Sequence, residues 1–235
     1  DLTGLFTGDC GALGFKAVAT LRLIPRAAVN TFGSFAFERY EDMFPAMSAI
    51  SRANLVNECF GFDPYLQSQR MKRDSLASDA KKFVGVLKSA GGVGKAIREG
   101  AKMAVAGRHF MDDVKWSFHV MIEAETDDSA KSRLDKVRDI IARHNGRELS
   151  DSIPRVVRAN PFGPVNNMLG PEGERWVPVH GLLPHSRAVE AMDGIEALFE
   201  RNREEMDRQG IECGYLLATV STSCFVLEPV FFWPD

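Results

Sequence analysis

The order in which two kinds of apolar pattern follow one another constrains the fold of this chain more than any other feature. Apolar side chains that recur every second residue indicate strands, and those that recur every three to four residues indicate helices. Strand patterns occupy 31–38, 55–60, 115–124, 175–182, 211–220 and 223–233, and helix patterns occupy 41–53, the stretch after Asp127, and 186–209. Strand, helix and strand thus follow one another twice. We predict an α+β fold of duplicated ferredoxin-like units with a broad antiparallel β-sheet flanked by helices.

The clearest strand pattern lies at 115–124. One row of its side chains is apolar and the other is mixed, and the mixed row contains Ser117, His119, Met121 and Glu123. Such alternation is typical of a half-buried strand. Two acidic residues then open the next helix, and Asn145-Gly146 supplies its stop.

Two segments lack a clear single pattern. From Pro64 to about Gly107 the chain has helical spacing that is interrupted near Gly91-Gly92, and we expect a helical excursion there. The glycines of that break do not form a phosphate-binding P-loop, because Ser89 stands in place of its first glycine. Residues 159–174 are rich in Pro and Gly and predict a loop that is either functional or a linker.

Composition and charge exclude several classes of protein. The chain is 45% apolar and 26% charged, which is typical of a globular protein. Its 32 acidic and 29 basic residues give a net charge of −3, so we expect no nucleic-acid partner. No apolar run reaches the roughly 18 residues of a membrane helix, and we expect no membrane span. The four cysteines are far apart with no C-x-x-C pair, which favours reduced thiols and a cytoplasmic location.

A glycine-rich segment opens the chain. Gly4, Gly8, Gly11 and Gly14 precede an alternating stretch at 16–25 that predicts a strand ended by Pro25. Glycines before a strand allow a ligand to approach the backbone closely. The alternative is a tight turn between two strands, and the spacing alone leaves both interpretations open.

The segment FTGDCGALGF at 6–15, with the strand that ends Leu23-Ile24-Pro25, resembles the end of the FAD-binding domain in FAD-linked oxidases of the vanillyl-alcohol oxidase type. The family pattern is roughly F-x-G-[ST]-x-G-x-L-G. Asp9 stands where Ser or Thr is usual, and Phe15 stands where Ile or Val is usual. WVPVHGLLPHS at 176–186 and VLEPVFFW at 226–233 are similar to the second half of the family's substrate, or cap, domain.

This resemblance implies a division of the chain and a cofactor. Residues 1–27 would end the FAD-binding domain, and 28–235 would form the substrate domain, with halves at about 28–158 and 175–235. The cofactor contacts it implies are Gly8, Asp9, Gly11, Gly14 and Phe15. It also implies a fragment of an FAD-dependent oxidoreductase, in which hydride passes from a C–OH or benzylic carbon to flavin. We expect the full-length protein to bind FAD and this piece alone to lack it.

In such chemistry the protein supplies an acid or base beside the carbon that loses hydride. Glu228 is the first candidate, because it shares a strand row with apolar residues where burial would raise its pKa. His180 is the second, since it lies on a strand that leads into a Pro-marked turn. The alternatives are a solvent-facing or ion-paired Glu228 and a structural His180.

Four further residues are candidates for substrate binding. Arg155 and Arg158 could bind a carboxylate or lie at the surface as solvated charges, Tyr215 could present a phenol, and His119 could be a ligand or a structural histidine. No set of residues has metal-ligand spacing, so we expect no metal. We expect a small-molecule substrate and consider a homodimer through the substrate domain possible. The rival interpretation is a non-catalytic ligand-binding or oligomerisation module.

Overall fold

A computed structural model of the chain describes residues 2–9, 11–73, 113–159 and 173–234. The strands are β1 (Val29–Phe37), β2 (Glu58–Phe62), β3 (Trp116–Ala124), β4 (Arg147–Leu149), β5 (Arg175–Pro178), β6 (Gly181–Leu183), β7 (Glu212–Val220) and β8 (Cys224–Trp233). The helices are α1 (Thr3–Phe6), α2 (Tyr40–Arg52), α3 (Pro64–Arg73), α6 (Asp127–Arg143), α7 (Ser152–Ala159), the 3₁₀ turn η3 (His185–Arg187), α8 (Ala188–Arg201) and α9 (Arg203–Gln209).

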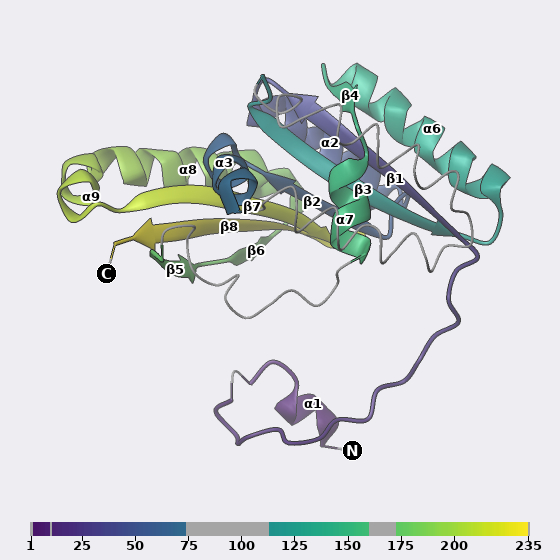
Figure 1. The fold of residues 1–235 in the computed structure, drawn as a ribbon, viewed down its shortest axis with the longest axis horizontal. Coiled ribbons are helices and arrows are strands. Elements are labelled where there is room, and N and C mark those ends of the chain that lie inside the picture. The colour runs from purple at the N-terminus through teal and green to yellow at the C-terminus, as the bar shows by residue number, and fades with distance from the viewer. Residues whose placement is uncertain (1, 10, 74–112, 160–172, 235) are drawn as a thin grey trace.

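All the strands belong to a single eight-stranded sheet (Figure 1). Its order is β4-β1-β3-β2-β7-β8-β5, β6 also pairs with β8, and every pairing is antiparallel. The predicted α+β fold with a broad antiparallel sheet is confirmed.

The first half of the chain has a split βαβ connectivity. Helix α2 joins β1 to β2, and β3 lies between these two strands and is antiparallel to both. Helix α6 then leads to β4, which pairs with the far side of β1. The order strand, helix, strand, strand, helix, strand therefore places the strands as β4-β1-β3-β2.

The second half repeats the first part of this pattern. Strands β5 and β6 are followed by α8 and α9 and then by the β7–β8 hairpin, and β8 lies between β7 and β5. No second crossover helix and fourth strand follow among the described residues. The two halves meet where β2 pairs with β7, in the register Phe60↔Ala218, and they share one sheet.

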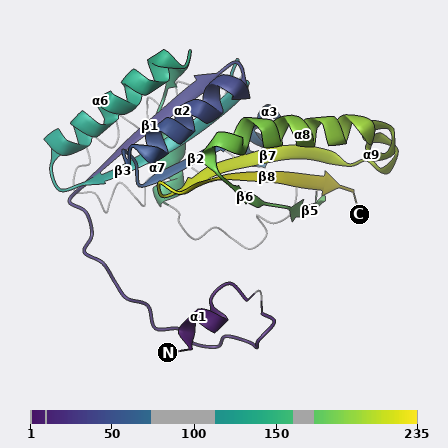
Figure 2. The same cartoon turned by 180° about the vertical axis from the view of Figure 1, so that it is seen from behind.

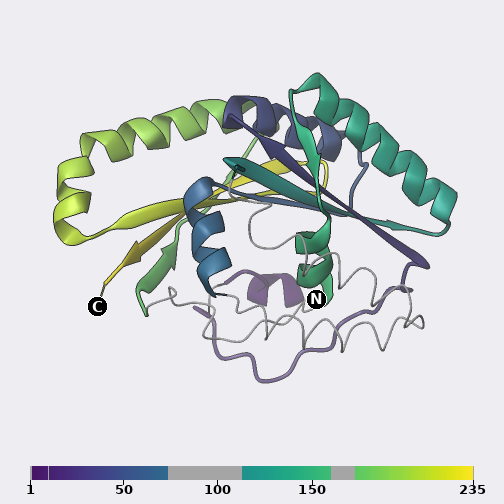
Figure 3. The same ribbon diagram turned by 45° about the horizontal axis from the view of Figure 1, so that its top comes forward.

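The sheet has two faces that are covered differently. Helices α2, α6 and α8 cover what we call the first face, while α3 and α7 lie on the second face (Figures 2 and 3). The first face holds the main core, whose sheet residues include Phe35, Phe118, Leu217 and Phe225. On the second face, a smaller apolar cluster of Phe62, Leu66, Val230 and Phe232 lies beneath α3.

The predicted strand at 16–25 is wrong. This stretch has no regular secondary structure (Figure 1). Its apolar side chains are exposed, with Val18 at 89% and Leu23 at 87%. An alternating pattern becomes a strand only when a neighbour pairs with its backbone groups. No described strand of this chain pairs with it.

Other strands and helices begin or end at residues different from the predicted ones. The strand predicted at 175–182 is divided into β5 and β6 after Pro178, and the helix predicted at 186–209 is divided at Asn202. We expected Ser186 to cap this helix, but Ser186 lies inside the 3₁₀ turn η3, and α8 begins at Ala188. Helix α3 confirms the start of the helical excursion after Pro64, whose remainder and most of the predicted loop at 159–174 lie outside the described residues.

The buried carboxylate of Asp63 holds the junction between the halves. It follows β2, and its two oxygens accept hydrogen bonds from the backbone N–H groups of Tyr65 (3.1 Å) and Leu66 (2.9 Å) at the start of α3. It also accepts one from the N–H of Tyr215 on β7 (2.8 Å). A Cβ at Gly214 would lie 2.9 Å from this carboxylate, so the close approach requires glycine there. One side chain thus fixes β2, α3 and β7 together.

We predict that Asp63→Ala lowers the free energy of unfolding by about 2–4 kcal/mol, because it removes a helix cap and leaves buried N–H groups unpaired. Urea unfolding followed by circular dichroism measures the change. Ser68→Ala is the matched control on the same helix, since its exposed hydroxyl donates only to the carbonyl of Tyr65, and it should change stability by less than about 0.5 kcal/mol. Equal losses in the two variants would contradict the role of Asp63.

Asp63 also has a pH signature. Burial raises its pKa to about 6, although the three backbone N–H groups act in the opposite direction. A carboxyl whose pKa is higher in the folded state stabilises the fold most below its unfolded pKa, and this contribution is lost as pH rises from about 4 to about 6. We predict that the stability difference between the wild type and Asp63→Asn shrinks over this range, as measured by urea unfolding at several pH values.

Candidate functional site

Glu228 and His180, the two predicted catalytic residues, lie side by side. Glu228 is on β8, and His180 occupies the short break between β5 and β6. The Nδ1 atom of His180 is 3.6 Å from Oε2 of Glu228. The glutamate side chain is 16% exposed and the imidazole is 61% exposed. A half-buried carboxylate is therefore paired with an imidazole that solvent can reach.

The strand register explains this pairing. Pro178 lies opposite Val230, and Gly181 lies opposite Leu227, so β5 and β6 have the same register on β8. Continued across the break, that register places His180 opposite Glu228. Side chains of directly opposed residues in antiparallel strands point to the same face. The backbone N–H of Val179 donates to the carbonyl of Pro229 (2.9 Å) and holds the break against β8.

The pair has an apolar setting on the second face. Val226 and Val230 are the neighbours of Glu228 in its strand row, and Leu216 lies opposite it on β7. A carboxylate and an imidazole at this distance can exchange a proton through one water. The arrangement can therefore serve as an acid–base pair, with His180 on the solvent side.

His119 lies on the same face but elsewhere. It is fully buried on β3, and its Nδ1 atom is 2.9 Å from Oγ of Ser34 on β1. The rings of Phe60 and Phe62 lie 5.3 and 5.8 Å from the imidazole. Burial lowers the pKa of His119 to about 3. Strands β2 and β7 separate β3 from β8, so three strand spacings, about 14 Å, lie between the strands of His119 and Glu228, and His180 lies one strand further.

Arg155 and Arg158 are on α7, above β1 and β3. Arg155 donates to Asp151 (2.7 Å), and its guanidinium lies 4.9 Å from the centre of the Phe32 ring. Arg158 pairs with Glu123 and lies 3.7 Å from Glu58. Both guanidinium groups are thus engaged by carboxylates, and neither is brought to the Glu228–His180 pair.

Tyr215 lies on the first face, beneath α8. It is 4% exposed, its hydroxyl donates to Glu196, and its ring stacks on Phe199 with the centroids 6.2 Å apart. Burial, followed by the hydrogen bond to Glu196, raises its pKa. The sheet itself therefore separates Tyr215 from the other candidates.

The glycine segment forms a turn built around Asp9. Its carboxylate accepts hydrogen bonds from the backbone N–H groups of Gly11 (3.3 Å) and Leu13 (3.1 Å) and pairs with Lys16. Gly8, Gly11 and Gly14 have φ values of +78°, +82° and +140°, which favour glycine. Phe15 is fully exposed. The three glycines expose backbone without side chains, which fits the close approach of a cofactor, and the turn around Asp9 explains their conformation equally well.

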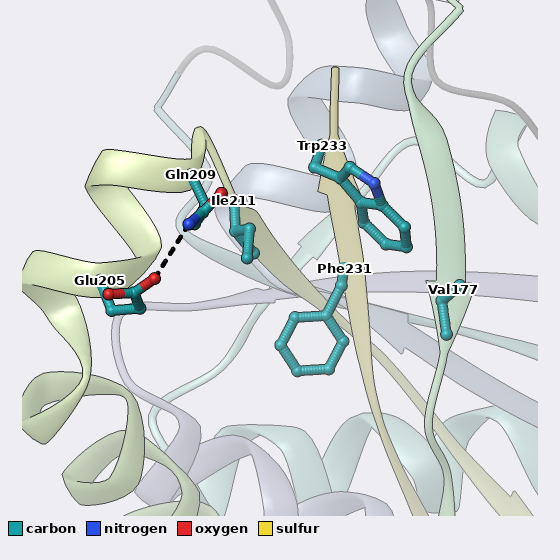
Figure 4. A pocket seen from close by; sticks show the side chains of 6 residues that line it. All are labelled: Val177, Glu205, Gln209, Ile211, Phe231 and Trp233. Atoms are coloured by element: carbon teal, nitrogen blue, oxygen red, sulfur yellow. Dashed lines mark hydrogen bonds between the residues drawn. The ribbon is translucent and has the colours of Figure 1, made fainter. Parts of the chain in front are cut away.

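A cavity of about 420 Å³ opens on the first face at the end of the sheet (Figure 4). It lies between α9 and the ends of β5, β7 and β8, and its walls are mostly apolar. The lining residues are Val177, Glu205, Gln209, Ile211, Phe231 and Trp233. Gln209 donates to Glu205 (3.0 Å), so its polar edge is satisfied internally. The strand patterns did not predict this cavity, because the division between α8 and α9 creates it.

Within the described ranges, no group of three His, Cys, Asp or Glu side chains could hold a metal ion. In the same part of the chain, no helix has both the length and the apolar character needed to cross a membrane.

The fold is similar to that of several solved structures. An alkyldihydroxyacetonephosphate synthase matches 100% of this chain and 41% of its own, with a TM-score of 0.63 and 12% identity. A p-cresol methylhydroxylase with substrate bound matches 90% of this chain and 40% of its own, with a TM-score of 0.51 and 12% identity. No family model and no curated protein sequence matches the chain.

These matches show that the chain shares its fold with a part of each of these enzymes. At 12% identity the likeness shows the fold alone. The chain spans about two fifths of the length of the solved structures that it matches.

His119 generates a prediction on acid stability. Its folded pKa lies below the usual 6.5, so the unfolded chain binds a proton that the folded chain excludes. The stability that a neutral His119 contributes is present above pH 6.5 and is lost as pH falls toward 3. Between pH 7 and pH 5, we predict that the free energy of unfolding falls by about 2 kcal/mol less in His119→Gln than in the wild type. Urea unfolding at both pH values measures this, and Ser34→Ala, which retains the imidazole, should keep the loss.

Proposed function

We propose that this chain is the substrate-domain portion of an FAD-dependent oxidoreductase that transfers hydride from a C–OH or benzylic carbon to flavin. The observation that carries the proposal is the pairing of Glu228 with His180 on one face of a sheet with this fold. An acid–base pair in an apolar setting is what removal of a hydroxyl proton requires during hydride loss.

The fold supports the enzyme class. The structural neighbours are enzymes, an alkyldihydroxyacetonephosphate synthase and a p-cresol methylhydroxylase, and together with the flavoprotein resemblance of 6–15 they favour a flavoenzyme-like domain here. Since the chain spans only about two fifths of those neighbours, the activity belongs to a larger assembly of which this sheet is one part.

In this proposal, Glu228 accepts the substrate proton and His180 passes it to solvent. The apolar row on either side of Glu228 limits hydration of the carboxylate, which keeps it available as a base. His180 is mostly exposed and can release the proton to water. FAD would supply the hydride acceptor, and Gly8, Gly11 and Gly14 would contact it along their exposed backbone.

We predict that Glu228→Gln, in the flavoprotein that contains this chain, slows flavin reduction by roughly two to four powers of ten. Its melting temperature should change little, because the variant keeps the volume and removes a half-buried charge. Anaerobic stopped-flow reduction and thermal melts measure the two effects. Glu212→Gln, at an exposed position on β7, is the matched control and should reduce at the wild-type rate.

A double-mutant cycle tests whether the pair acts as a unit. If His180 receives the proton from Glu228, the combined variant with His180→Gln should be little slower than Glu228→Gln alone. Unchanged reduction rates in Glu228→Gln would remove the catalytic role of the carboxylate. If the rate reductions of the two single variants multiply in the double variant, His180 acts independently of Glu228.

We also predict that the 235-residue chain, purified alone, is colourless. Affinity for a dinucleotide is spread over a whole domain, and one glycine turn cannot offset the cost of immobilising the ligand. Visible absorbance of the purified protein checks this directly. A stoichiometric flavin spectrum would contradict it and would mean that the turn and the sheet suffice for binding.

A further inference from the structure

One buried nitrogen on the second face has no partner. His119 is fully buried, and its Nδ1 atom contacts the Ser34 hydroxyl, yet its Nε2 atom makes no hydrogen bond in the described part of the chain. Nearly all buried polar atoms in folded proteins are paired, because an unpaired one costs a large part of its hydration. The fold thus retains an unsatisfied polar atom where an apolar side chain would fit.

The polar groups around this nitrogen are uncharged or already occupied. Ser34 on β1 and the two phenylalanines of β2, Phe60 and Phe62, are neutral. From α3, the side chain of Gln67 accepts a hydrogen bond from Ser117 (2.7 Å) and donates to the carbonyl of Val114 (3.2 Å).

Helix α7 brings two arginines to this face of the sheet, and each is paired with a carboxylate from outside the helix. Arg155 is bound to Asp151, and Arg158 to Glu123. The shift of the His119 pKa has burial as its only cause, with no contribution from a neighbouring charge. The described residues that contact His119 therefore offer hydrogen bonding and no charge.

We propose that His119 Nε2 forms a hydrogen bond with an uncharged polar group of the substrate, a hydroxyl or a carbonyl, and that this position selects against a carboxylate. This inference rests on the proposed function, because it assigns the second face to substrate binding. Phe60 and Phe62 would contact the apolar part of the same molecule beside that group.

The chemistry of a neutral imidazole explains the selectivity. Burial lowers the pKa of His119 to about 3, so the imidazole is neutral at pH 7 and provides no cation for an anion. If the Ser34 hydroxyl donates to Nδ1, Nε2–H is a donor; if Nδ1–H donates to Ser34, Nε2 is an acceptor. A substrate hydroxyl can hydrogen-bond to Nε2 in either tautomer, because it both donates and accepts. A carbonyl can do so only when Nε2 carries the hydrogen.

The test compares two small probes of similar size and different charge on the whole chain. Benzyl alcohol and benzoate are titrated at pH 7 while the imidazole nitrogens are observed by ¹⁵N NMR. We expect benzyl alcohol to shift the His119 Nε2 signal with millimolar affinity, and benzoate to leave it unchanged. Glu212→Gln, at an exposed position on β7, should bind benzyl alcohol as the wild type does, whereas His119→Phe should bind it more weakly when the ¹H signal of the probe itself is followed.

Three results would overturn the inference: an equal or larger shift with benzoate, no shift with either probe, or a signal that reports a bound water only. Because the readout is binding and not turnover, it is independent of flavin chemistry. If Glu228→Gln leaves flavin reduction unchanged while benzyl alcohol still binds at His119, the proposed acid–base role fails and the binding site stands.

Stability provides a second readout that distinguishes a binding residue from a structural one. If Nε2 awaits a ligand, the variant His119→Phe combined with Ser34→Ala leaves no buried polar atom unpaired there. Its melting temperature should be unchanged or higher by about 2–4 °C. A marked decrease in melting temperature would show that the imidazole supports the fold itself.

Discussion

The pairing of β2 with β7 is the constraint on which the rest of the molecule depends. It is the only contact by which the described strands of the first half join those of the second, and Asp63 and Gly214 secure it at close range. Because the pairing makes one continuous sheet, it also gives the halves common faces. His119 from the first half and Glu228 from the second therefore lie on the same side of the molecule.

The two faces of this sheet have different chemical characters. The first face is closed by three helices over an aromatic and aliphatic core, and its polar groups, such as the hydroxyl of Tyr215, bond to the covering helix. The second face buries Ser34, Ser117, Gln67 and His119 among apolar neighbours. Buried polar groups are costly unless they are fully paired. Ser34, Ser117 and Gln67 have hydrogen-bond partners, so among these four residues the cost falls on the unpaired Nε2 atom of His119.

Much of the sheet could be predicted because strands with one polar row leave a period of two in the sequence. The 115–124 pattern matches β3, and both hairpin strands near the C-terminal end were predicted within one residue. Asn145-Gly146 also marks a true stop, since Asn145 has a positive φ and a Cβ at Gly146 would meet the Phe37 ring. The prediction of a strand at 16–25 was wrong because an alternating pattern indicates which side chains a strand would bury. It does not indicate whether a neighbouring strand is present to pair with the backbone.

Less of the candidate site than of the sheet could be predicted from the sequence. Tyr215 could not be assigned to a face from its strand, because β7 has apolar residues in both rows. His180 was predicted as a candidate independently of Glu228. The sequence did not indicate that the strand would break after Pro178, or that β5 and β6 would keep the same register on β8 across the break. The role of Asp63 could not be predicted either, because it depends on a hydrogen bond from Tyr215, which is 152 residues away in the sequence.

The two polar positions on the second face have complementary properties. The imidazole of His180 is solvent-exposed beside a carboxylate, where a proton can come and go, while that of His119 is buried beside a hydroxyl, where it stays neutral. A histidine suits proton transfer in the first setting and fixed hydrogen bonding in the second. With four strand spacings, about 19 Å, of mostly apolar sheet between the two imidazoles, the proposed site could orient a molecule at one end and exchange a proton at the other. The burial of each imidazole, and not the residue type, determines which task it can perform.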